Sequence, residues 1–561
     1  MTETPDREAY LAVRVLDSLL REDYGSIASI MTSDKDGVAV VLASGRRIRL
    51  ATGSPFQDFA VAEPGQGQGV SLAEVLDTLA VIADPADGAG VAAFARECRE
   101  ALAGLELHDR HRAQVAARLR GREGTLLFYE ALAAAVDHPI YPTARCRLGV
   151  PEAGLVAHAP EFAPSFELAW AAVPGERVTV SGTAFGAVSV TVSGTAFGTA
   201  FGTGRGAGLP DWWPTPGDIG LPGRLAGTHV PFPVHPLTVP VVEGLPGVVM
   251  GVKPYLTVRP TLSMRTVEVD DLTHLKVPLA TSTLGLLNRR SIKPGTLRDG
   301  ALAESLLREV LAREPAARVA VAGEQNYGHA GHEYLGWLVR NLPEGEIVPV
   351  AALLAPWPDG EGDRLVLHHL AERHYGGDVH ALLRDYLSVL LSWNALLFVR
   401  YGLALEAHQQ NLALVFGDGP MRLLVKDNDG LLVSPGLLGA AGIEPPNFSD
   451  HRMLTDDPHA LADVFVTITL HLAAAAIVFP ALVAGRPESA ASALIRDALS
   501  AALEPFGDDP MARLLRARTL ESARLVGKSM VVAGTLVDKR RSGAADINKF
   551  YGVTGPNYLR P

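Results

Sequence analysis

The chain has 561 residues, too many for one hydrophobic core, so roughly two to four domains or lobes are expected. Its content of 48% hydrophobic and 20% charged residues is typical of a soluble globular enzyme. A formal net charge of −12 argues against a nucleic-acid partner. The two cysteines, Cys98 and Cys146, exclude a disulfide framework and a multi-cysteine zinc site.

The sequence shows no pattern of an export signal or a membrane span. The first ten residues, MTETPDREAY, are acidic and polar, unlike a signal peptide. The apolar stretch 470–483 is too short to span a bilayer and is interrupted by Pro480, so a buried helix is the better interpretation. We therefore expect a cytoplasmic protein with no membrane partner.

The first 135 residues predict a mostly helical region. Apolar residues recur at helical spacing in 9–22, which indicates an amphipathic helix. Residues 37–51 alternate in polarity, as in a hairpin, and 71–135 are rich in alanine and leucine, as in a helical layer. No residue in this region suggests chemistry.

The segment 138–149, HPIYPTARCRLG, presents polar side chains from a loop that prolines stiffen. His138 is followed by Tyr141, Arg145 and Arg147, and two arginines near a histidine suit an anion. The alternative is an ordinary loop without a ligand.

An internal repeat follows. VTVSGTAFG occurs at 178–186 and again at 190–198, and we interpret 178–203 as an expanded surface hairpin or loop, mobile and without an assigned function. His235, at the end of an extended apolar run, is interpreted as structural.

The second polar constellation lies in 260–290. PTLSMRT (260–266) is followed by a strand and then by LKVPLATSTLGLLNRR (275–290). Hydroxyls and cations on a strand-to-helix turn suit phosphate oxygens, although a hydroxyl at Thr281 or Ser282 is also what caps a helix. The side chains proposed for phosphate are Lys276, Thr281, Ser282, Thr283, Arg289 and Arg290.

Two further segments lead to the most informative stretch. His329, His332 and Glu333 superficially suggest a zinc helix, but their order is wrong and the neighbouring glycines weaken a helix, so no metal site is expected there. Residues 380–401 predict a long buried helix.

Residues 402–430, GLALEAHQQNLALVFGDGPMRLLVKDNDG, predict two short strands joined by a Gly/Asp/Pro turn. A hairpin brings its two polar ends together, here 406–411 and 426–429. Their carboxylates, amides, imidazole and cation suit a magnesium-bound nucleotide, whereas solvated strand ends are the alternative.

These motifs resemble those of the NRPS-independent siderophore (NIS) synthetases, the IucA/IucC family. GLALEAHQQN resembles the family pattern G-x-x-x-E-x-H-x-Q-N, and KDNDG resembles its Arg-Asp at the end of the next strand. Segment 138–149 resembles a family motif with a second histidine and a lysine where this chain has Tyr141 and Arg145. Segments 260–266 and 275–290 resemble elements that line the nucleotide phosphates.

The resemblance implies an α+β fold, a three-lobed cupped hand of thumb, fingers and palm with antiparallel sheets and helical layers, usually dimeric. We expect a helical thumb-like lobe at 1–135. A fingers-like lobe at 136–350 would contain the repeat insertion 178–203, and a palm-like lobe would occupy 351–561. The family also ends in a lysine-bearing helix, which would place Lys528 as a substrate ligand.

The implied reaction is ATP-dependent and AMP-forming. A carboxylate such as citrate is adenylated and then condensed with an amine or hydroxyl, in siderophore biosynthesis. The resemblance implies that ATP contacts Gln410 and the phosphate residues above, and that Glu406, Asn411 and Asp427 hold both ATP and Mg²⁺. Catalysis is assigned to Arg340, His408 and His138. The carboxylate would contact Arg340, His138, Arg145 and Lys528. The alternative is a degenerate homologue that binds a carboxylate or siderophore without catalysis.

Overall fold

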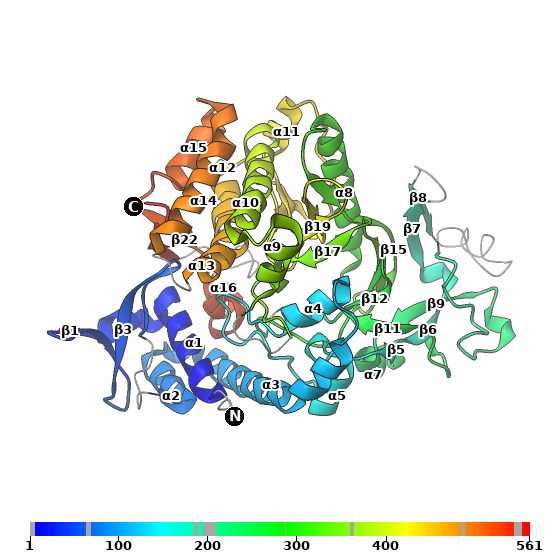
Figure 1. Cartoon of the computed structure of the whole chain (residues 1–561). Coiled ribbons are helices and arrows are strands. Elements are labelled where there is room, and N and C mark those ends of the chain that lie inside the picture. The colour runs from blue at the N-terminus through cyan, green and yellow to red at the C-terminus, as the bar shows by residue number, and fades with distance from the viewer. Residues whose placement is uncertain are drawn as a thin grey trace.

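The computed structural model describes residues 6–62, 69–183, 189–193, 209–286, 288–358, 364–483, 488–542 and 553–560. The molecule combines helical layers with largely antiparallel sheets (Figure 1). One extensive hydrophobic core takes residues from near both chain ends, between Leu11 and Leu559. A second core, made of residues between Leu168 and Val339, lies under the largest sheet.

The N-terminal region forms as predicted. Asp6 caps the first helix by accepting a hydrogen bond from the Ala9 N–H, and Ser71 and Glu74 form a reciprocal capping box on the second. The helix at 9–22, the hairpin at 37–51 and the helical layer at 71–135 are confirmed. The elements are α1 (Arg7–Glu22), β1 (Met31–Asp34), β2 (Gly37–Val41), β3 (Arg47–Ser54), β4 (Gln57–Val61), α2 (Leu72–Ile82), α3 (Gly88–Leu119) and α4 (Leu126–Ala134).

The largest sheet has eight strands and lies at the right of Figure 1. In spatial order they are β5 (Phe166–Glu167), β11 (Thr257–Pro260), β12 (Thr266–Asp270), β13 (Thr273–Lys276), β16 (Leu335–Asn341), β15 (Gly323–His332), β7 (Thr179–Thr183) and β8 (Ser189–Ser193). A three-stranded sheet contains β10 (Val249–Met250), β6 (Ala169–Pro174) and β9 (His229–Val234). The described part of the repeat is therefore a hairpin, β7–β8, at the sheet edge; residues 184–188 and 194–203 lie outside the described residues.

The predicted hairpin in 402–430 is confirmed within a four-stranded sheet. Its strands pair antiparallel, and the Lys426 N–H donates to the Asn411 carbonyl at 3.0 Å, so the two polar ends meet. The sheet order is β14 (Val319–Val321), β20 (Arg422–Val425), β19 (Leu412–Phe416) and β17 (Glu346–Pro349). A two-stranded ladder pairs β18 (Leu403–Ala404) with β21 (Leu432–Val433).

Helices fill most of the remaining chain. The predicted helix at 380–401 is confirmed as α10 continued by one π-helical turn, Leu397–Tyr401. The α-helices between residues 150 and 450 are α5 (Glu152–His158), α7 (Val239–Glu243), α8 (Pro294–Arg313), α9 (Val366–Tyr375), α10 (Val379–Leu396) and α11 (Pro435–Ala440). After 450 come α12 (Pro458–Val464), a π-helical segment (Phe465–Ala475), α13 (Ala476–Val483), α14 (Glu488–Leu503), α15 (Pro510–Arg518) and α16 (Lys539–Ser542).

The apolar stretch at 470–483 belongs to a longer helical run than predicted. Two helical runs among the described residues, Val379–Tyr401 and Pro458–Leu482, are long and apolar enough to cross a membrane by length and composition alone. Because 72% and 89% of these apolar windows are buried inside the protein, their apolar faces are already covered by protein, as in core helices.

Segments from near the two ends of the chain pack together, and blue and red elements are neighbours in Figure 1. Strand β22 (Arg524–Gly527) pairs with β23 (Val553–Pro556), and β23 packs on β4. Arg524 forms an ion pair with Asp58 of β4 at 2.7 Å. The C-terminal segment is thereby fixed against the N-terminal sheet.

Two local predictions were wrong. No helix begins at Thr281 or Ser282, because the chain instead folds back on itself through a β-bridge between Ser282 and Arg289. Lys528 is not on a helix but follows β22 directly. The division into thumb, fingers and palm stays a prediction.

Gly90→Ala tests the contact between the N-terminal layer and the C-terminal segment. A Cβ atom at this position of α3 would lie 2.0 Å from the backbone carbonyl oxygen of Leu536. Overpacking against backbone should lower the free energy of unfolding by about 1–3 kcal/mol, measured by urea denaturation. Gly88→Ala in the same helix is the control, because nothing lies within 4 Å of its Cβ. Equal stability of both variants would contradict this packing.

Candidate active site

A cavity of about 460 Å³ lies between the eight-stranded sheet, the four-stranded sheet, the segment that follows α4 and the C-terminal segment around Lys528. That volume is in the range of small-molecule sites. Its lining comes from segments far apart in sequence: 133–147, 262–300, 406–411, 427–430 and 528–530. The predicted site residues that line it are His138, Arg145, Lys276, Thr283, Arg289, Arg290, Glu406, His408, Gln410, Asn411, Asp427 and Lys528.

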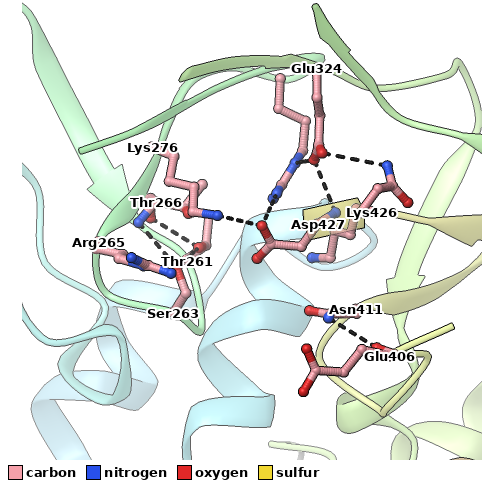
Figure 2. Close-up of polar contacts among 12 residues, drawn as sticks. Thr261, Ser263, Arg265, Thr266, Lys276, Glu324, Glu406, Asn411, Lys426 and Asp427 are labelled. Atoms are coloured by element: carbon pink, nitrogen blue, oxygen red, sulfur yellow. Dashed lines mark hydrogen bonds and ion pairs between the residues drawn. The ribbon is translucent and has the colours of Figure 1, made fainter. Parts of the chain in front are cut away.

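Asp427 is the centre of a charged network in this cavity (Figure 2). It follows β20 directly and has a left-handed backbone, with φ of 65°, which is uncommon for a non-glycine residue. Its carboxylate contacts the Lys276 ammonium from β13 and lies 3.4 Å from Arg340. Although burial opposes ionisation, these two cations and Arg265 hold the pKa of Asp427 below its usual range.

Arg340 lies behind Asp427 and does not itself line the cavity. Its Nε donates to Glu324 Oε1 at 2.5 Å, and that carboxylate also accepts the Asp427 N–H at 3.0 Å. Both Arg340 and Glu324 are buried. The arginine therefore orients Asp427 in this structure, and its predicted contact with a carboxylate substrate stays a prediction.

Some side chains of the 281–290 loop line the cavity, and others make hydrogen bonds to the surrounding protein. Thr281 donates to the Leu148 carbonyl at 2.9 Å and, with Ser282, is absent from the cavity lining. Arg290 instead lines the cavity, and its Nε donates to Thr283 Oγ1 at 2.5 Å. Arg289 reaches the rim, where it pairs with Glu333 at 3.0 Å.

Cations accumulate around Arg290. Burial, followed by the charges of Arg265 and Arg147, lowers its pKa to about 9. All three arginines line the cavity. Guanidinium groups held this close repel one another, so this part of the cavity is suited to a polyanion such as a phosphate chain.

The two predicted histidines both line the cavity as neutral donors. Burial, with the nearby charge of Lys528, lowers the pKa of His408 to about 4, and burial also lowers that of His138. Nδ1 of His408 accepts the Gln410 N–H at 3.3 Å, and Nδ1 of His138 accepts the Tyr141 N–H at 3.0 Å. Each neutral ring therefore carries its proton on Nε2, which makes it a hydrogen-bond donor to an anion.

The other two predicted substrate ligands, Arg145 and Lys528, also line the cavity. Arg145 is buried and pairs with Asp137 at 2.8 Å, with a further bond to the Ala135 carbonyl at 2.5 Å. Lys528 is only 5% exposed and faces the same cavity as the histidines. Both stay predictions as substrate contacts.

Glu406, Gln410 and Asn411 lie together in the segment directly before β19. Figure 2 shows Glu406 and Asn411 next to one another, and Asn411 Nδ2 donates to the Glu406 carbonyl at 3.1 Å. Gly430 packs directly on Glu406, because a Cβ there would lie 2.2 Å from Oε2. Among the described residues, no group of three His, Cys, Asp or Glu side chains is placed to hold a metal by itself.

Sequence reasoning missed several buried carboxylates. Glu130 pairs with Lys426 at 3.0 Å and accepts the Leu262 N–H at 2.9 Å, so α4 joins two cavity segments. Asp429, which belongs to the predicted 426–429 cluster, also lines the cavity, and desolvation, with the charge of Asp427, raises its pKa. The only signal for Glu130 was its charge in the apolar helix LLFYEALAA.

Glu97 on α3 was also missed. It is buried and accepts hydrogen bonds from Tyr141 at 2.7 Å, Thr143 at 2.5 Å and Thr535 at 2.8 Å. Tyr141 therefore points away from the cavity and has a structural contact where the family motif has a histidine. Glu97 links the 138–149 loop to the C-terminal segment.

The fold and this arrangement define a siderophore-synthetase architecture, and comparisons with known proteins agree. Residues 125–355 match the model of the IucA / IucC family. Residues 380–533 match that of the Ferric iron reductase FhuF-like transporter, a stretch without the cysteines that ligate most iron–sulfur clusters. No curated protein matches the chain. The stretch 125–355 belongs to the IucA/IucC family of NIS synthetases.

Solved structures share the whole fold. Petrobactin biosynthesis protein AsbB from Bacillus anthracis str. Sterne has a TM-score of 0.72 at 14% identity, covering 98% of this chain and 96% of that one. ATP-bound aerobactin synthetase IucA from a hypervirulent pathotype of Klebsiella pneumoniae has 0.71 at 18% identity, covering 98% and 99%. Aerobactin synthetase IucC from the same source has 0.67 at 19% identity, covering 99% and 98%.

Tyr141→Phe should destabilise the fold without changing the lining of the cavity, to which Tyr141 does not contribute. Buried Glu97 then loses one of three hydroxyl donors, which costs about 1–3 kcal/mol of unfolding free energy near pH 7. Burial raises the pKa of Glu97, and a protonated carboxyl needs the donor less, so the loss should shrink as pH falls through that value. Thermal unfolding from pH 7.5 to about 5 measures it. Tyr375→Phe, which removes a bond to the less buried Asp385, is the control; a pH-independent loss would contradict the role of Glu97.

Proposed function

We propose that this protein is an ATP-dependent, AMP-forming ligase of siderophore biosynthesis. It activates a carboxylate, such as citrate or a related acid, as the acyl-adenylate and condenses it with an amine or hydroxyl nucleophile. The observation that carries the proposal is the single cavity shared by the 138–147, 262–290, 406–411 and 427–430 segments. A relative with the same fold is described as ATP-bound.

The distribution of charged side chains supports separate positions for the triphosphate and the carboxylate within the cavity. Arg147, Arg265 and Arg290 form a cationic wall suited to the triphosphate, with Thr283 beside it. His138, His408 and Lys528 form a second group of donors suited to the carboxylate. The two groups line one cavity, which would bring the carboxylate close to the α-phosphorus.

In the first step, a carboxylate oxygen attacks the α-phosphorus of ATP, and the bond to pyrophosphate breaks. Negative charge accumulates on the phosphoryl oxygens, where Lys276, Arg265 and Arg290 are already oriented to stabilise it. Asp427 and Glu324 keep Lys276 and Arg340 in place, so little reorganisation is needed.

In the second step, the nucleophile attacks the acyl carbon, the bond from that carbon to the adenylate oxygen breaks, AMP leaves, and the nucleophile loses its proton to water. The neutral rings of His138 and His408 would donate from Nε2 to the acyl or phosphoryl oxygens. Because Nδ1 of each ring already accepts a backbone N–H, these histidines act as donors and not as the base that takes the amine proton.

Magnesium fits the donor set at this site. Glu406, Asp427, Asp429 and Asn411 offer hard oxygen ligands in the cavity, and Mg²⁺ in nucleotide sites is held by one or two carboxylates together with substrate phosphates. This agrees with the lack of a complete protein ligand set among the described residues. When bound, the ion would neutralise phosphate charge. The expected dimer and the cytoplasmic location remain part of the proposal.

Pyrophosphate release tests the proposed function. The purified protein with Mg·ATP should release pyrophosphate and AMP when given the right member of a panel of polycarboxylates, with amines or hydroxylamine as acceptors. His408→Ala should reduce release by about 100-fold, because a donor to the reacting oxygens is lost. Ligand binding by calorimetry without any ATP affinity would instead favour a non-catalytic homologue, and ADP as the product would indicate phosphoryl transfer; either result overturns the ligase.

Gly430→Ala should reduce turnover without unfolding the protein. Its Cβ displaces the Glu406 carboxylate, whose flexible end can move aside, so the proposed magnesium ligand is lost from its position. Activity or magnesium affinity should fall by about 10–100-fold. Steady-state rates across magnesium concentrations and the melting temperature measure this. Gly439→Ala, with nothing within 4 Å of its Cβ, should match the wild type; normal magnesium dependence in Gly430→Ala would contradict the assignment of Glu406.

A further inference from the structure

Helix α1 forms hydrogen bonds to the loop that carries His138, although its sequence indicated only an amphipathic helix. Arg14 donates to the carbonyl oxygens of His138 at 2.5 Å and Tyr141 at 3.1 Å. Arg21, seven residues and about two turns further along the helix, donates to the Ile140 carbonyl at 2.7 Å. The backbone that carries His138 is therefore held by two arginines of this helix.

Glu22, the last residue of α1, holds a second segment. Its side chain is fully buried, and it accepts hydrogen bonds from the Ser529 hydroxyl at 2.7 Å and from the N–H groups of 530, 531 and 532 at 2.9, 3.0 and 2.9 Å. The Arg21 guanidinium also lies 3.5 Å from Oε1 of Glu22. The three N–H groups are donors at the start of the helical turn Val532–Leu536, so a residue 510 positions away caps this turn.

The segment that Glu22 holds follows Lys528 directly. Lys528 lies between β22 and this capped turn, so both flanks of its backbone are fixed. Its side chain is buried and faces the cavity that also receives His138 and His408. Burial, followed by the charges of His408 and Lys528, lowers the pKa of His138.

We propose that Glu22 is a positioning residue for Lys528. Its carboxylate fixes 529–532, and this keeps the Lys528 ammonium in the carboxylate-binding part of the cavity. Helix α1 thus positions both the loop that carries His138 and the segment that follows Lys528, although the two residues are 390 positions apart in sequence. As far as turnover is concerned, this inference rests on the proposed function.

Glu22→Gln is the main variant. The amide keeps the shape of the side chain, but its NH₂ group replaces one of the two acceptor oxygens, so the backbone N–H bonds made to that oxygen are lost. Release of the 529–532 backbone should lower kcat/KM for the carboxylate by about 100-fold, as for a displaced contact residue. Lys528→Met should lower it similarly, and the double variant should be no worse than Lys528→Met alone. Losses that multiply in the double variant would show that Glu22 does not act through Lys528.

A second measurement does not depend on turnover. In the ligand-free protein, the rate at which an amine-reactive reagent acylates Lys528, followed by mass spectrometry, should rise about tenfold or more in Glu22→Gln as the segment opens. Asp109→Asn, which removes the ion pair to Arg7 at the other end of α1, should leave that rate unchanged. An unchanged rate in Glu22→Gln overturns the proposal.

The two hypotheses can fail separately. Faster labelling of Lys528 in a protein that never releases pyrophosphate would retain the positioning role and remove the proposed reaction. Glu22→Asp keeps the charge with a shorter reach and should show partial labelling and partial activity, so it carries the same test if Glu22→Gln does not fold.

Discussion

The contact between Lys276 and Asp427 joins two sheets at the cavity, where one strand of each sheet ends. Lys276 ends β13 of the eight-stranded sheet, and Asp427 follows β20 of the four-stranded sheet. Removing two charges from water is costly unless further partners surround them, and here Arg340 and Glu324 supply those partners. The network therefore joins the two sheets at the cavity, where Lys276, Glu324 and Asp427 are part of the lining.

Buried carboxylates of the N-terminal helices extend the same principle. Glu22, Glu97 and Glu130 each accept several hydrogen bonds from segments that line the cavity. Each bond joins residues between 44 and 510 positions apart. A buried carboxylate left without its donors is costly, so these contacts specify one arrangement of loops that have little regular structure of their own. The helical layer without obvious chemistry is thus the frame of the site.

The electrostatics of the cavity follow from this frame. Burial, followed by the charges of Arg265 and Arg147, lowers the pKa of Arg290, while burial keeps His138 and His408 neutral. A bound polyanion would offset the repulsion between the arginines, and the neutral histidine rings can donate hydrogen bonds without a proton transfer. The proposed binding of a nucleotide beside an organic acid would use both properties.

Local sequence determined much of this protein. The period of apolar residues predicted α1, α10 and the β19–β20 hairpin, and the density of the motifs at 406–411 and 426–429 predicted the family, because backbone periodicity and motif spacing are properties of neighbouring residues. The sequence could not show that Thr281 faces Leu148 or that Tyr141 faces Glu97. It could not show that Glu22 caps a turn near the C-terminus. Those choices depend on which distant backbone donors remain unpaired after packing, and only the tertiary structure decides that.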